Sequence, residues 1–122
     1  MKLESQVTSL EISKRLKELG VKQESLFYYV GGEDGKHPIW TSFNKEISLF
    51  ENKDFTYSAF TVAELGELLP EYHWSEKQSD GWCGCTRVET GKDKYIIHTQ
   101  KTEADARGKM LIYLLENKLV TL

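Results

Sequence analysis

The chain has 122 residues, 39% apolar and 11% aromatic, and we expect one domain spanning residues 1–122. The formal net charge of −3 lacks the basic excess that is typical of proteins binding duplex nucleic acid through its phosphates. The longest apolar run covers residues 110–115, whereas a membrane-spanning helix needs about 20 residues, and residues 1–16 lack the apolar segment of a signal peptide. We therefore expect a cytoplasmic protein that has no membrane partner.

The first predicted element is a helix over residues 9–19. Thr8 and Glu11 match the capping box, in which the hydroxyl oxygen accepts a hydrogen bond from the backbone N–H three residues on. Apolar residues recur at helical spacing, and Gly20 follows the last of them, as is typical of a helix C-terminus. The same start recurs at Thr61…Glu64 and, with aspartate in place of glutamate, at Thr102…Asp105.

Two strands are predicted next, at residues 26–30 and 39–43. Both runs are rich in aromatic and β-branched residues, and a stretch containing glycines and a proline separates them. We expect these two strands to form an antiparallel hairpin. Residues 44–60 fit either short strands or irregular chain, and the sequence does not separate these alternatives.

The second half of the chain repeats the mixture of helix and hairpin. A short helix is predicted over residues 60–69, a polar segment follows at 71–80, and runs 82–89 and 94–100 predict a second hairpin around a turn at 90–93. A third helix is predicted over residues 102–117. The order α-β-β-(β)-α-β-β-α predicts an α+β fold, with three helices and a mainly antiparallel sheet of about four or five strands built from two hairpins.

Aromatic residues are the predicted contact residues. Tyr28, Tyr29 and Trp40 lie on adjacent predicted strands, and Trp74 lies further along the chain. Three helices are too few to cover both faces of a sheet completely, so we expect some of these aromatic side chains to be exposed. Exposed Tyr and Trp side chains are rigid and amphipathic, which suits the recognition of another macromolecule. The alternative is that these rings fill the core.

A basic cluster gives the second candidate function. Lys14, Arg15, Lys17 and Lys22 lie in or just after the first predicted helix. Such a cluster could contact nucleic-acid phosphates, but the recognition helix of a helix-turn-helix protein should follow, and the next run is predicted to be a strand. A solvated helix face is the alternative interpretation of these charges.

Cys83 and Cys85 are the candidate metal ligands. Residues two apart in a strand face the same way, so both thiols could reach one ion. The C-x-C spacing differs from the usual zinc signatures, and the favoured interpretation is two small apolar residues facing the core, with Gly84 easing close packing. The sequence therefore predicts no metal, no cofactor and no catalytic residue.

Three stretches resemble a group of small, uncharacterised proteins from phages and prophage-like regions of bacterial genomes. They are VTSLEISKRLKELGVKQESLFYYV, FTVAELGELLP and TEADARGKMLIYLLENKLV, which together cover about half of the chain. The resemblance implies a mobile-element protein that is expressed inside a bacterium. It implies no catalytic or binding residues, because the group has no assigned activity.

These observations favour a non-catalytic interaction module over an enzyme. The expected partner is an unidentified protein of the host or the phage, contacted first through Tyr28, Tyr29 and Trp40 and second through Trp74. Nucleic-acid binding through the basic first helix is the second hypothesis, and a small metal-binding or enzymatic domain is the third. The sequence does not predict the oligomeric state.

Overall fold

The structure is a computed structural model that describes residues 2–31, 35–41, 56–89 and 93–122 of the chain. The end of the predicted strand 39–43, residues 44–55 and most of the turn 90–93 lie outside the described residues. Nothing in the described part is a helix long and apolar enough to cross a bilayer.

The described elements confirm the α+β class. Beyond a 3₁₀ turn η1 (Leu3–Ser5), the helices are α1 (Leu10–Glu18), α2 (Val62–Leu68) and α3 (Glu103–Glu116). The strands are β1 (Phe27–Val30), β2 (Ile39–Thr41), β3 (Thr56–Ala59), β4 (His73–Gln78), β5 (Gly81–Glu89) and β6 (Asp93–Gln100).

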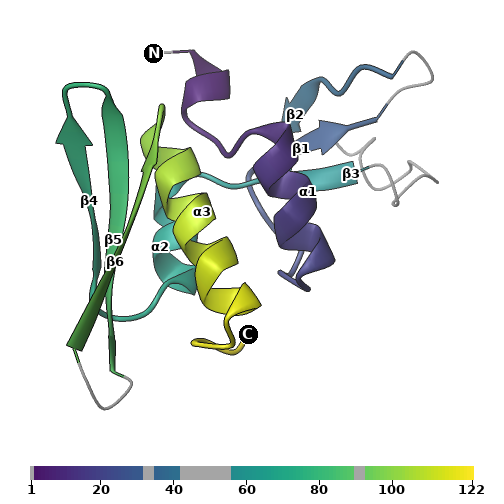
Figure 1. The fold of residues 1–122 in the computed structure, drawn as a ribbon. Coiled ribbons are helices and arrows are strands. Elements are labelled where there is room, and N and C mark those ends of the chain that lie inside the picture. Colours follow the sequence, from purple (N-terminus) through teal and green to yellow (C-terminus); the bar gives the residue numbers. More distant parts are fainter. Residues whose placement is uncertain (1, 32–34, 42–55, 90–92) are drawn as a thin grey trace.

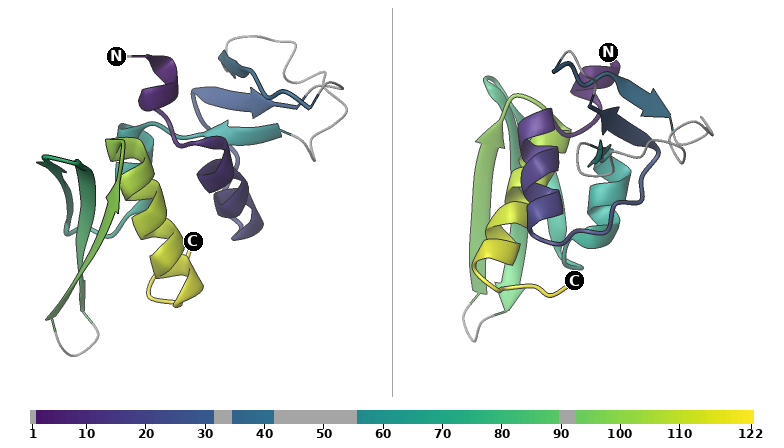
Figure 2. Two further views of the ribbon diagram at one scale, coloured as in Figure 1. Left: turned by 45° about the horizontal axis from the view of Figure 1, so that its top comes forward. Right: turned by 90° about the vertical axis from the view of Figure 1, so that its right-hand side faces the viewer.

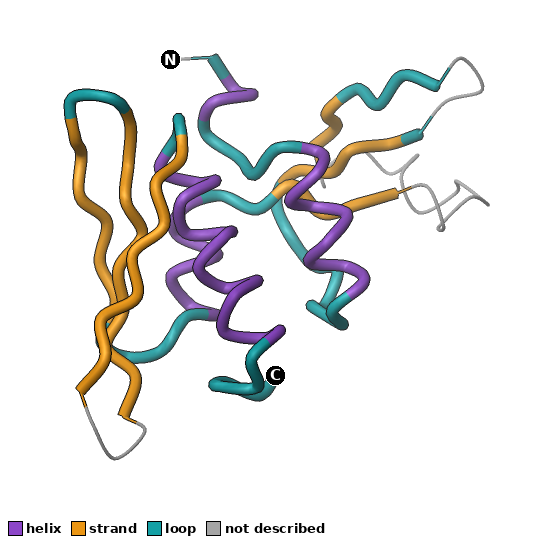
Figure 3. Tube along the Cα trace, in the orientation of Figure 1, coloured by secondary structure: helices purple, strands orange, loops and turns teal. Residues whose placement is uncertain are grey.

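The described strands form two antiparallel sheets, whereas the sequence predicts one. The smaller sheet has the order β2-β1-β3 and the larger sheet has the order β4-β5-β6. Each predicted hairpin has a third strand in the structure. Strand β3 pairs with β1 in the smaller sheet. Strand β4, which lies in the polar segment 71–80, pairs with β5 in the larger sheet. The two sheets lie at opposite ends of the molecule with the helices between them (Figure 3).

Helix α3 is the central element of this arrangement. It packs against β5 and β6 of the larger sheet, and it also contacts α2 and α1 (Figures 1 and 2). The smaller sheet packs on α1, mainly through β3. Apolar side chains of the three helices and of residues that flank α1 and α2 form the main core. It contains Ile12, Leu16, Val21, Phe60, Leu65, Leu69, Met110, Leu111, Ile112 and Leu114.

Two glycines allow the close approach of α3 to its neighbours. A Cβ atom at Gly84 of β5 would lie 2.5 Å from the backbone oxygen of Ala106. A Cβ atom at Gly108 of α3 would lie 2.7 Å from Cγ2 of Ile12 in α1. Both distances are shorter than real Cβ contacts, so a side chain at either position would push the elements apart.

Two of the three predicted helix starts are confirmed. Thr61 and Glu64 form the complete capping box of α2, and the Thr102 side chain accepts from the backbone N–H of Asp105 at the start of α3. The prediction of Thr8 as the cap of α1 is wrong. The cap is Ser9, whose Oγ accepts from the backbone N–H of Ile12 at 3.5 Å.

Thr8 instead joins three parts of the fold. Its side chain is fully buried, and its Oγ1 lies 2.8 Å from the Ser13 Oγ of α1 and accepts from the backbone N–H of Phe60 at 3.1 Å. Its carbonyl oxygen accepts from the Tyr29 hydroxyl of β1 at 2.8 Å. The next residue, Ser9, donates its backbone N–H to Asp105 of α3 at 2.7 Å.

Helices α1 and α3 end in the same way. After α1, the N–H of Gly20 bonds to the carbonyl of Lys17 and the N–H of Val21 bonds to the carbonyl of Leu16, with Gly20 at φ +91°. This is the Schellman motif, which requires a residue in the left-handed region. After α3, Lys118 occupies the equivalent position at φ 55°, and Leu119 bonds back to Leu114.

Replacing Lys118 should therefore separate backbone strain from charge. A left-handed conformation costs an L-residue about 1–2 kcal/mol, and glycine avoids this cost. We expect Lys118→Gly to be about 1 kcal/mol more stable than Lys118→Ala, because both variants lose the ammonium and only the first relieves the strain. Urea unfolding of the two variants measures the difference, and equal stabilities would show that position 118 is not strained.

Candidate interaction surfaces

The outer face of the larger sheet carries one candidate surface. Gly84 faces α3, and Ser75, its cross-strand partner on β4, accepts a hydrogen bond from Arg107 of α3. Because side chains alternate along a strand, Cys83 and Cys85 lie on the opposite face. Their cross-strand partners on β4 are Glu76 and Trp74, respectively. We call these four residues, Trp74, Glu76, Cys83 and Cys85, the outer cluster.

Trp74 is the exposed member of the outer cluster. Its side chain is 37% exposed, and its indole N–H donates to Oε1 of Glu76 at 3.1 Å. All three described helices lie on the other side of this sheet (Figure 1). The structure therefore places the predicted contact residue Trp74 on a sheet face that the described helices leave uncovered, beside one carboxylate.

The two cysteines are buried, but they do not face the helical core as the sequence analysis expects. Cys83 and Cys85 are free thiols on the outer face, and the Cys83 Sγ lies 3.3 Å from the Thr99 Oγ1 of β6. Burial raises the pKa of the Cys85 thiol, and the charge of Glu76 and the neighbouring Cys83 add to this shift. A protonated thiol is a poor metal ligand and a poor nucleophile. Across the described residues, no three groups of the metal-ligating types gather at one place.

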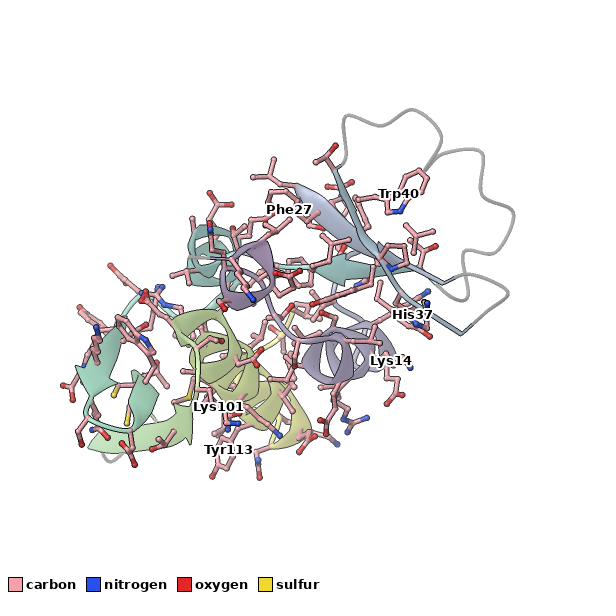
Figure 4. All side chains as sticks on the ribbon, turned by 90° about the horizontal axis from the view of Figure 1, so that it is seen from above. Lys14, Phe27, His37, Trp40, Lys101 and Tyr113 are labelled. Atoms are coloured by element: carbon pink, nitrogen blue, oxygen red, sulfur yellow. The ribbon has the colours of Figure 1, made fainter. Side chains whose placement is uncertain are left out.

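Tyr28 and Trp40 form a second candidate surface on the smaller sheet. They are direct cross-strand partners between β1 and β2, so they lie on the same face, and both are half-buried. The Tyr28 hydroxyl donates to the carbonyl of Gln23 and accepts from the N–H of Ser25, each at 3.2 Å. The Tyr28 hydroxyl is thus hydrogen-bonded within the protein. Trp40 lies in the part of the smaller sheet that is remote from α3 (Figure 4).

The prediction of Tyr29 as a contact residue is wrong. Tyr29 is only 7% exposed and belongs to a small apolar cluster with Val7 and Ala59. Its hydroxyl donates to the carbonyl of Thr8, and its pKa is raised to about 12, mainly by burial and further by the charges of Asp105 and Glu4. Alternation along β1 turns Tyr29 toward the chain that precedes α1, where it is buried.

Internal contacts engage all four residues of the predicted basic cluster. Arg15 forms ion pairs with Glu18 and Glu116 at 3.1 Å each, and Lys22 pairs with Glu24 at 3.2 Å.

The other two members, Lys14 and Lys17, lie beside the Tyr57 ring. Their ammonium groups are 5.6 Å and 5.1 Å from the ring centre, respectively. Lys17 also donates to the carbonyl of Thr56.

Acidic side chains also share the groove between α1 and α3. This groove has a volume of about 430 Å³, and Lys14 and Arg15 line it together with Glu11, Glu18 and Glu116. The mixed charges give little net attraction for phosphates, because nucleic-acid affinity depends on an excess of cations. The geometry thus favours the alternative interpretation of these charges as a solvated helix face.

A cavity of about 530 Å³ lies where α2 and α3 begin. Thr61 and Thr102, the caps of the two helices, line it together with Trp82 and Lys101. A pocket of this size could hold a small organic molecule. Both caps are predictable from the sequence but the cavity is not, because Thr61 and Thr102 are brought together only by the packing of α2 and α3.

Comparisons with known proteins do not place the chain in a family. No family model matches the chain, and no curated protein or solved structure matches it either. The interaction surface is therefore inferred from the geometry of the described residues.

Proposed function

We propose that this protein is a non-catalytic interaction module that binds another protein through the outer cluster, with Trp74 as the central contact. The observation that carries the proposal is the exposure of Trp74 on a sheet face that the described helices leave uncovered. Tryptophan is among the residues that dominate binding energy at protein interfaces, because it buries a large rigid surface and keeps one polar atom.

The position of β4 supports a protein partner. Strand β4 is at the edge of the larger sheet, and within the described residues no strand lies beyond it. An extended segment of a partner could add to such an edge through main-chain hydrogen bonds, with specificity coming from the alternate side chains. Trp74 and Glu76 lie on one face of β4, so a partner strand with an apolar and a basic residue two positions apart would complement them.

The origin of the partner follows from the resemblance to phage and prophage proteins. We propose a protein of the bacterial host or of the phage, and an accessory role for the chain inside the bacterium. Tyr28 and Trp40 form the second candidate surface for this partner, since their pairing across β1 and β2 leaves both rings half-buried.

The test is capture of a partner by the wild-type protein and by two matched variants. Trp74→Ala should weaken binding by at least about 30-fold, which corresponds to about 2 kcal/mol, because the ring is the main apolar contact. Trp40→Ala makes the same change on the smaller sheet and should leave the affinity within about three-fold. The partner is first recovered from a bacterial lysate with and without nuclease, and its Kd is then measured with purified proteins.

Each outcome has a defined meaning. A purified partner whose affinity falls with Trp74→Ala alone supports the outer cluster, provided that the melting temperature of the variant stays within a few degrees. An affinity that falls with Trp40→Ala instead would move the site to the smaller sheet. Capture that is lost on nuclease treatment would contradict the proposal and favour nucleic-acid binding through Lys14, Arg15, Lys17 and Lys22.

A further inference from the structure

Arg107 of α3 is a half-buried cation without an acidic partner in the described structure. Its guanidinium makes one hydrogen bond, from Nε to the Ser75 Oγ of β4 at 2.6 Å. None of the ion pairs seen among the described residues reaches Arg107. A partly desolvated guanidinium is normally matched by a carboxylate or by another anion, because its charge loses hydration on burial. Among the residues that the structure describes, none provides such a match for the two terminal nitrogens and their four N–H donors.

The surroundings of Arg107 supply further hydrogen-bonding groups that can face an anion. The Ser75 hydroxyl accepts from Nε, so its own proton remains to be donated. His73 lies two residues before Ser75 on the same face of β4, and its Nδ1 lies 2.6 Å from the carbonyl of Pro70. A carbonyl only accepts, so Nδ1 carries the hydrogen and Nε2 is the ring nitrogen that faces the site. Nε2 accepts a hydrogen bond from a protonated oxygen, or donates one when the ring is charged.

Gly66, which has no side chain, lets two of these groups approach α2 closely. It lies within α2, where glycine costs about 1 kcal/mol relative to alanine. A Cβ atom at this position would lie 3.1 Å from Nη1 of Arg107 and 3.4 Å from Nε2 of His73. Both nitrogens therefore approach α2 at Gly66, one from α3 and the other from β4. Gly66, His73, Ser75 and Arg107 are all partly exposed.

The geometry points to a binding site for a tetrahedral oxyanion of the phosphate class, formed by Arg107, His73 and Ser75 over Gly66. Two terminal guanidinium nitrogens, a hydroxyl and an imidazole nitrogen offer more hydrogen bonds than the two oxygens of a planar carboxylate can use. A phosphate group has three or four oxygens and the charge that Arg107 lacks, and the guanidinium fork binds two of these oxygens at once. The site lies on the face of the larger sheet opposite the outer cluster, so it does not depend on the proposed protein partner.

The test is a two-dimensional NMR titration of the protein with sodium phosphate at fixed pH and ionic strength. We expect saturable shifts of the Arg107 Nε–Hε and Gly66 amide signals, and we expect at least ten-fold weaker binding of acetate, which is planar. Glycerol phosphate is titrated in parallel, and whichever of the two binds more tightly identifies the source as free phosphate or a phosphomonoester.

Three variants make the test specific. Arg107→Gln should weaken phosphate binding at least ten-fold, whereas Lys101→Gln, which removes one positive charge just before α3, should leave it within two-fold. Gly66→Ala places a methyl group in the site while favouring the helix, and it should also weaken binding at least ten-fold. If Arg107→Gln does not fold, phosphate binding by Gly66→Ala tests the site instead. Equal binding by wild type and Gly66→Ala, equal affinity for acetate, or shifts without saturation would overturn the assignment.

Discussion

Gly84→Ala should lower the free energy of unfolding by about 3 kcal/mol. The new Cβ would lie 2.5 Å from the oxygen and 2.9 Å from the carbon of the Ala106 carbonyl. Both atoms belong to the α3 backbone, so no side-chain rotation can relieve the clash, and the helix must move off β5. For a chain of this size the loss corresponds to a decrease of about 10 °C in melting temperature.

Gly66→Ala is the matched control for this experiment. It adds the same methyl group against the ends of two flexible side chains, Arg107 and His73, instead of against backbone. It also removes a glycine from a helix, which offsets part of any crowding. We expect its free energy of unfolding to stay within about 1 kcal/mol of wild type. A melting temperature of Gly84→Ala close to that of wild type would show that α3 does not pack this closely on β5.

Thr8→Val should lower the free energy of unfolding by about 2 kcal/mol. Valine has almost the same shape as threonine, so packing is retained while the hydroxyl is lost. The backbone N–H of Phe60 then loses its acceptor, whereas the Ser13 hydroxyl keeps its bond to the backbone carbonyl of Thr8. An unmatched buried polar group costs about 1–3 kcal/mol. Urea unfolding measures the change.

Thr41→Val on β2 is the control for Thr8→Val, because it makes the same change at an exposed position. We expect an effect within about 0.5 kcal/mol. Hydrogen exchange of the Phe60 amide gives a local measurement: its protection should decrease in Thr8→Val and remain unchanged in Thr41→Val. Unchanged protection of Phe60 in both variants would contradict the bond to Thr8.

Local signals in the sequence are confirmed where their partners are also local. The bonds of Thr61 and Thr102 reach only three residues along the chain, so their spacing suffices to predict the starts of α2 and α3. Gly20 ends α1 by contacts within a single turn. Thr8 carries the same signal, but its hydroxyl bonds to Phe60, which is 52 residues away. Ser9 caps the helix instead, and no local pattern could show this.

The sheets and the surfaces depend on contacts between distant residues. Strand β4 has one strongly apolar residue, Trp74, because it is an edge strand with an uncovered outer face, so its composition resembles that of a loop. Alternation along β1 correctly separates Tyr28 from Tyr29, yet only the packing of neighbouring elements decides that Tyr29 is the buried one. Arg107 lies within a helix whose apolar residues belong to the core. Its approach to Gly66 and His73 becomes visible only when α2, α3 and β4 are packed together.

The position of α3 has a consequence for synthesis of the chain. This helix follows every other element in the sequence, yet it packs against α1, α2, β5 and β6. While the ribosome is still translating the segments before residue 103, Leu16, Phe60 and Leu65 lack the apolar partners that Met110, Leu111 and Leu114 provide. The nascent chain must therefore keep these surfaces from aggregating until α3 has been made, and completion of this core is a late step for the described elements.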